Sequence, residues 1–192
     1  MSNEVVLDIE TQNTFQDVGT AAHKGLKISV VGCYFYETDE YICYEEHELP
    51  QLFQRLEQSG RIIGYNTKGF DYLVMNNYYA GDVSRFSSLD ILEEIQKALG
   101  FRIKLDDVAK ATLGTGKSGH GLQAVEWWKQ GEIQKIKDYC LTDVKVTKEV
   151  YEFGKLYRLV RYFDRLGACH DIPVVFDAVA SASPAMNLTM GF

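Results

Sequence analysis

Two carboxylates lie at the end of the first apolar run of the chain, Val5-Val6-Leu7-Asp8-Ile9-Glu10. Because side chains alternate across a strand, Asp8 and Glu10 would share one face, while Leu7 and Ile9 would point the other way. Two carboxylates placed so close repel each other unless a cation lies between them. An all-oxygen pair favours a hard divalent ion such as Mg²⁺ or Mn²⁺, although many strands also end in two acidic residues that face water.

Two later segments carry side chains suited to the same chemistry. Asn66-Thr67-Lys68-Gly69-Phe70-Asp71 directly follows a short apolar run and places an amide and a carboxylate where a helix would begin. In Tyr139-Cys140-Leu141-Thr142-Asp143, the tyrosine and the aspartate are four residues apart and would share one helix face. Each segment also has a simpler interpretation, the first as a turn with a helix cap and the second as a solvated helix stripe.

In this order, the three segments resemble the motifs of the DEDD superfamily of 3′–5′ exonucleases. The family motif Asp-x-Glu matches Asp8 and Glu10, and Asn-x-x-x-Phe/Tyr-Asp matches residues 66–71. The third motif, Tyr-x-x-x-Asp, matches Tyr139 and Asp143 and is that of the tyrosine branch, DEDDy. The resemblance covers roughly residues 4–155. It is strongest to bacterial ribonuclease H-like exonuclease modules of unassigned substrate, and more distant to proofreading domains of family B DNA polymerases.

The resemblance implies an α/β, ribonuclease H-like fold and hydrolysis of phosphodiester bonds by two divalent ions, Mg²⁺ or Mn²⁺, about 3.5–4 Å apart. It also implies a role for each matching residue. Asp8 would bridge both ions, and Glu10 and Asp143 would complete the site of the attacking water. Asp71 would hold the second ion. The hydroxyl of Tyr139 would orient the water, since a phenol with a pKa near 10 is a poor full base.

Four further residues are candidates for contacts with the nucleic acid: Asn66, Phe70, Lys117 and His120. Asn66 could hold a sugar or a phosphate, or simply form a turn. Phe70 could stack on a base or belong to the core. Lys117 could attract a phosphate or lie on a solvated surface. His120 lies between glycines where a helix is expected to start.

Composition limits the classes of protein that remain. The 192 residues favour one domain, expected at 1–180, with a loose tail at 181–192. A net charge of −7 argues against tight non-specific binding to duplex DNA, but not against a nuclease that grips a strand end. The four cysteines form no C-x-x-C pair, which argues against a zinc site or a disulfide framework. The chain has no long apolar run, so we expect a cytoplasmic protein without membrane contact.

The elements that would position these residues follow from hydrophobic periodicity. Three strands come first and would form an antiparallel meander; strands and helices then alternate, and helices dominate the end. This order predicts a mixed central β-sheet flanked by α-helices. Gly60 is the expected C-cap of the first helix. Strands are expected at 4–10, 27–36, 41–44, 61–65 and 87–90, a C-terminal edge strand at 172–176 with its partner at 159–164, a loop at 11–26, and helices at 48–59, 70–79, 91–99, 105–112, 120–129 and 132–157.

The main hypothesis from the sequence is a metal-dependent 3′–5′ exonuclease acting on single-stranded DNA or RNA ends. A structure-specific endonuclease on the same fold is one alternative. A nucleic-acid-binding or scaffold domain without turnover is the other, and the acidic balance leaves room for it. A helicase or a polymerase could be a partner, but no residue identifies one.

Overall fold

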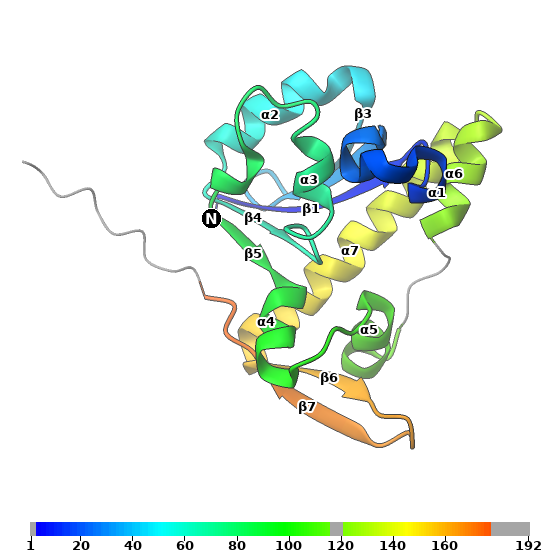
Figure 1. Cartoon of the computed structure of the whole chain (residues 1–192). Helices are drawn as coiled ribbons and strands as arrows, with labels where there is room; N and C mark the ends of the chain where they lie inside the picture. The colour runs from blue at the N-terminus through cyan, green and yellow to red at the C-terminus, as the bar shows by residue number, and fades with distance from the viewer. Residues whose placement is uncertain (1–2, 116–120, 178–192) are drawn as a thin grey trace, which may run out of the picture.

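The structure is a computed structural model that describes residues 3–115 and 121–177. The expected tail at 181–192 and the candidates Lys117 and His120 lie outside these ranges. Within them, the central sheet contains β1 (Glu4–Thr11), β2 (Ile28–Phe35), β3 (Glu40–Glu45), β4 (Arg61–Gly64) and β5 (Ser88–Asp90). The strand order is β3-β2-β1-β4-β5 (Figure 1). β1, β2 and β3 pair antiparallel, whereas β4 and β5 run parallel to β1, which confirms both the meander and the mixed sheet.

Helices cover both faces of this sheet. One face packs against α2 (Leu49–Gln58) and α3 (Asp71–Met75), and the other is crossed by the long helix α7 (Ile133–Tyr157). The hydrophobic clusters on the α7 side also include residues of α4 (Ile91–Leu99), α5 (Leu105–Leu113) and α6 (Gly121–Lys129). α4, α5, α6 and α7 agree with the sequence prediction. None of the described helices is long and apolar enough to cross a membrane.

β1 divides its side chains between the two faces as the sequence predicts. Leu7 and Ile9 belong to the cluster under α2 and α3, whereas Val6 belongs to the cluster under α7. Asp8 and Glu10 have the parity of Val6, so they lie on the side that faces α7.

The expected loop at 11–26 is wrong in part. It contains the short helix α1 (Phe15–Val18) and a 3₁₀ segment, η1 (Gly19–Gly25). The side chain of Thr14 accepts the backbone N–H of Asp17, and the Asp17 carboxylate accepts the backbone N–H of Thr14. This capping box starts a helix too short for any hydrophobic period to be visible in the sequence.

Two predicted helix ends are also wrong. The helix expected at 70–79 is only α3, because the side chains of Asn76 and Asn77 bond to backbone groups of neighbouring loops where the helix would continue. Gly60 does not cap α2, which ends on an extended residue instead. The N–H of Gly60 donates to the carbonyl before β1.

The C-terminal strand lies elsewhere than predicted. β6 (Leu159–Phe163) does pair with a later segment, but that strand is β7 (Cys169–Pro173), not 172–176. The two form a separate antiparallel sheet and add no edge to the central one. The segment after β7 instead packs against the core through alternate residues, because the buried side chains of Val174 and Phe176 join the cluster under α7.

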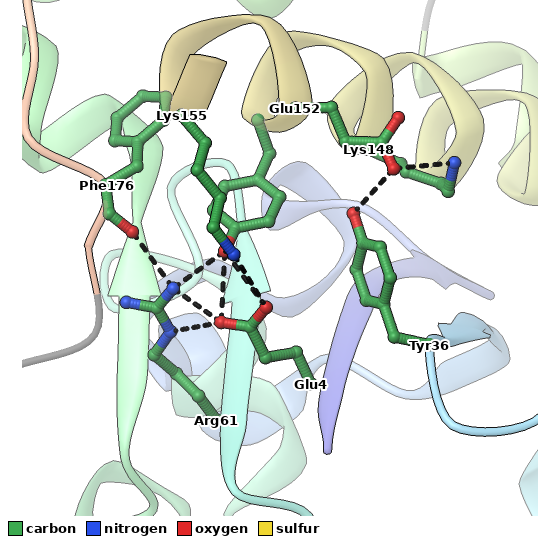
Figure 2. A network of polar contacts seen from close by, with 8 residues as sticks. Glu4, Tyr36, Arg61, Lys148, Glu152, Lys155 and Phe176 are labelled. Atoms are coloured by element: carbon green, nitrogen blue, oxygen red, sulfur yellow. Dashed lines mark hydrogen bonds and ion pairs between the residues drawn. The ribbon is translucent and has the colours of Figure 1, made fainter. Parts of the chain in front are cut away.

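A buried polar network ties this C-terminal segment to the sheet (Figure 2). The guanidinium of Arg61 donates to Glu4 at 2.6 Å, to the Tyr151 hydroxyl at 2.8 Å and to the carbonyl of Phe176 at 3.0 Å. Lys155 adds a second cation beside Glu4. Two ion pairs to Glu4 and their hydrogen bonds therefore join the start of β1, β4, α7 and the end of the described chain.

Candidate metal centre and substrate cleft

Three carboxylates meet where β1 passes beneath α7. Asp8 and Glu10 come from β1, and Asp143 comes from the middle of α7. One oxygen of each lies within 4.8 Å of the others. Glu10 and Asp143 are buried, and Asp8 is half-buried. The structure therefore brings together three of the four acidic residues singled out in the sequence.

A glycine lets α7 lie close enough for this meeting. Gly32 of β2 is the direct neighbour of Asp8 in the sheet. A Cβ at Gly32 would lie 2.8 Å from Cys140 Sγ and 3.0 Å from a methyl of Val144, both on α7. The Cys140 thiol also lies 3.4 Å from the backbone carbonyl of Asp8, to which it donates. Sequence reasoning missed Gly32 and Cys140, although a glycine inside a strand is a known signal of close backbone approach.

A cavity of about 540 Å³ opens over the carboxylates. Asp8, Glu10 and Asp143 line it, and so does Asp71, which is not part of the three-carboxylate group. Its apolar walls come from α1, from α6 and from Leu26, Tyr65 and Phe70 outside the helices. The volume lies within the range of small-molecule sites, and one wall is acidic while the others are mainly apolar.

Asp71 is a carboxylate held in a place that penalises its charge. It is the first residue of α3 and is buried. Burial, with a smaller contribution from the negative charge of Asp90, raises the pKa of Asp71 to about 7. A nearby cation would favour the ionised form.

Asp90 fixes the loop that carries Asn66 to the edge of the cavity. Its carboxylate accepts the backbone N–H groups of Asn66 and Lys68 at 2.8 and 3.0 Å. It also accepts the N–H of Leu92 and thereby caps the start of α4. Asn66 has a φ of +67°, a conformation that asparagine tolerates better than most residues. Its side-chain oxygen accepts a hydrogen bond from the Arg102 guanidinium.

The aromatic wall of the cavity combines a predicted residue with one that was missed, and a second missed residue, His23, packs against both of their rings. Phe70 is half-buried and lines the cavity. Its ring packs edge-on against Phe15 and near His23, each at 6.0 Å between centroids. Phe15 also lines the cavity and is 47% exposed. The sequence did not single out Phe15 or His23, because both lie in the segment expected to be a loop.

Tyr139 lies on α7 one turn before Asp143 and is buried. Its ring packs edge-on against Trp127 of α6, with 5.9 Å between centroids. Tyr139 is not among the described residues that line the cavity, whereas Asp143 is. The predicted helix and spacing of this pair are therefore present, with the two side chains in different surroundings.

The donor set fits a divalent cation. Three carboxylates offer only oxygen atoms, which suit hard ions such as Mg²⁺ or Mn²⁺. Two of the three are buried, and grouping buried negative charges is costly without a compensating cation. Asp8, Glu10 and Asp143 could therefore hold an ion, and Asp71 offers a further carboxylate in the same cavity.

Comparison with known proteins adds two findings. A sequence model described as the RNase_H superfamily matches residues 5–153. Among solved structures, the chain is similar to the family B DNA polymerase from the hyperthermophilic archaeon Pyrobaculum calidifontis, with a TM-score of 0.60 and 16% identity. The similarity covers 79% of this chain and 24% of that one, so this chain spans about a quarter of the polymerase, and at this identity it concerns the fold alone. No curated protein matches the chain.

Proposed function

The chain belongs to the RNase_H superfamily, and from this premise we propose that it is a metal-dependent 3′–5′ exonuclease acting on single-stranded DNA or RNA. The observation that carries the proposal is the meeting of Asp8, Glu10 and Asp143 at the floor of a cavity also lined by Asp71. The mixed sheet with helices on both faces is the α/β, ribonuclease H-like fold expected from the sequence. The cavity is large enough to receive one nucleotide.

Each residue then has a distinct task. Divalent ions bound at the carboxylates supply neutralisation of charge on the phosphate and on the leaving oxygen. Asp8, Glu10 and Asp143 would hold one ion, and Asp8 and Asp71 the other. Tyr139, one turn before Asp143, would orient the attacking water through its hydroxyl.

The apolar wall supports the choice of a strand end as substrate. Phe15 and Phe70 present aromatic surface beside the carboxylates, where an unpaired base could stack. Asn66, at the edge of the same cavity, offers an amide to the sugar or phosphate of that nucleotide. A terminal nucleotide would thus have its base on the apolar wall and its phosphate at the acidic floor.

The test is a time course on 5′-labelled single-stranded DNA and RNA with Mg²⁺ or Mn²⁺. Wild type should give a ladder that shortens from the 3′ end, and Asp143→Asn should not. Asp138→Asn is the matched control, because Asp138 lies on the same helix, is exposed and undergoes the same change of charge. Internal cuts would instead identify an endonuclease, and binding without cleavage in either metal would identify a non-catalytic binding domain.

A further inference from the structure

A second cavity adjoins the first at the carboxylates. It has a volume of about 390 Å³ and shares Asp8, Tyr65 and Asn66 with the first cavity. Two cationic side chains line it, those of Arg102 and Lys104. The rest of its lining is apolar and comes from the start of α4 and the segment leading into α5: Leu92, Ile103 and Leu105.

No carboxylate of residues 3–115 and 121–177 neutralises these two cations by an ion pair. Both side chains are exposed, and among the described residues neither forms an ion pair with a carboxylate. Arg102 donates instead to the neutral side-chain oxygen of Asn66. On the neighbouring helix α5, Lys110 is paired with Asp106, so this lysine is already neutralised.

The two cavities differ in the chemistry of their linings, and this difference indicates which part of a bound strand each would hold. The first has an acidic floor and aromatic walls, which suit a terminal nucleotide together with its cations. The second presents two positive charges, which suit a phosphate of the nucleic-acid backbone. Arg and Lys are the usual partners of such phosphates, and the planar guanidinium can contact two phosphate oxygens at once. A strand that crosses Asp8 would therefore pass from the second cavity into the first.

We propose that Arg102 and Lys104 form a phosphate subsite. It binds the backbone phosphate next to the scissile one on the leaving side, which is the part of the strand that carries the leaving oxygen. This inference rests on the proposed nuclease function and defines its substrate further. The preferred substrate is a polynucleotide with at least one phosphate beyond the bond that is cut, not a diester of a single nucleotide. The border residue Asn66, held by Arg102, lies between the two subsites.

The first experiment measures binding. The probe is fluorescein-labelled oligothymidylate, and its anisotropy is followed in Ca²⁺ over a range of salt concentrations. Lys104→Gln and Arg102→Gln should each flatten the plot of log K against log [salt] by about 0.7, the value for one phosphate contact on a single strand. Lys110→Gln is the matched control, since Lys110 lies on α5 outside the cavity. A Lys104→Gln slope equal to that of the control overturns the subsite.

The second experiment places the subsite on the leaving side. Thymidine 5′-(p-nitrophenyl phosphate) has a single phosphodiester; water attacks phosphorus, the bond to the p-nitrophenyl oxygen breaks, and thymidine monophosphate and p-nitrophenol form. Lys104→Gln should lower the ratio of kcat/KM on the oligonucleotide to kcat/KM on this diester by about tenfold, the size of one contact worth about 1.4 kcal/mol. Equal losses on both substrates would overturn the leaving-side position.

The two experiments separate this inference from the function on which it rests. If wild type hydrolyses neither substrate, the exonuclease proposal fails, while the salt slopes still decide whether the cavity binds phosphate. Arg102→Lys adds a further readout. It keeps the charge but loses the planar group, so it should keep the salt slope and still weaken binding. If the plot of log K against log [salt] became flatter in Arg102→Lys, this would contradict the inference that the positive charge at position 102 contacts a phosphate.

Discussion

Gly32→Ala should weaken divalent-ion binding by a larger factor than a comparable overpacking elsewhere on α7. The new Cβ would lie 2.8 Å from Cys140 Sγ and 3.4 Å from the Cys140 backbone carbon, where ordinary contact begins at 3.4 Å. The sulfur must therefore retreat by at least about 0.6 Å, and overpacking of this kind costs about 1–3 kcal/mol. Because Asp143 follows Cys140 within one turn of α7, it should move with the helix, away from Asp8.

A shift of this size exceeds the tolerance of a metal site, where ligand distances hold within about 0.2 Å. We therefore expect the affinity for Mn²⁺ to fall by about ten- to a hundredfold, the usual cost of disturbing the residues that support metal ligands. The assay is calorimetric titration with Mn²⁺, together with urea denaturation in EDTA to measure the free energy of unfolding of the metal-free protein.

The control is Gly154→Ala, which overpacks the same helix far from the carboxylates. A Cβ at Gly154 would meet the ring of Phe176 at 2.2 Å. Gly154 lies eleven positions after Asp143 on the helix, which is about 16 Å along the axis. This variant should lose stability and keep its affinity for Mn²⁺.

The double variant Gly32→Ala/Cys140→Ala makes the reasoning refutable. Removing Cys140 Sγ removes the closest of the three contacts, so most of the lost Mn²⁺ affinity should return, and only the contact with Val144 at 3.0 Å remains tight. If the double variant binds Mn²⁺ as weakly as Gly32→Ala alone, the helix-to-sheet distance does not set the metal site. Wild-type affinity in Gly32→Ala would lead to the same conclusion.

Three further outcomes follow from buried charge and exposed aromatic surface. Burial raises the pKa of Asp71 from 3.8 to about 7. The contribution of protonated Asp71 to the stability of the folded protein is therefore fully present below pH 3.8 and is lost as the pH rises through 7. Asp71→Asn should therefore stabilise the metal-free protein by up to about 4 kcal/mol at pH 8 and by almost nothing near pH 4, as measured by urea denaturation in EDTA. Glu4→Gln leaves buried Arg61 without its carboxylate and should lower the free energy of unfolding by about 3 kcal/mol in the same assay. Glu152→Gln removes the more exposed ion pair with Lys148, also drawn in Figure 2, and should lower it by less than about 1 kcal/mol. Phe15→Ala should raise the KM for oligonucleotides by about tenfold with little change in kcat, if stacking on this ring holds the terminal base.

The sequence predicted what depends on local patterns. Hydrophobic periodicity located most strands and helices, because each carries enough apolar residues for its period to be visible. Alternation along β1 correctly placed Asp8 and Glu10 on the face opposite Leu7. The short helix α1 was not predicted, because four residues held by a capping box are too few to show a hydrophobic period. For the same reason Phe15 was not a candidate, although it lines the cavity.

Contacts between segments that are far apart in the chain could not be predicted from the sequence. Nothing near Gly32 indicates that Cys140, more than a hundred residues later, will lie against it. The pairing of Arg102 with Asn66 is equally non-local, and it brings a cation to the edge of the cleft. Motifs found the carboxylates that line the cavity, but not the residues that set the distances between them.

The acidic balance and a nucleic-acid substrate are compatible because of how the charges are placed. Most lysines on the surface helices are paired with carboxylates, as Lys97 is with Glu94 and Lys110 with Asp106, so they contribute little attraction over distance. Arg102 and Lys104 are among the described cations without such an ion pair, and they line a cavity together with Asp8. Under the proposed function, an anionic strand would therefore gain attraction where cations bind the carboxylates and where these two side chains lie beside them. Such an arrangement favours engagement of one short stretch of strand over non-specific coating of a long one, as removal of nucleotides from an end requires.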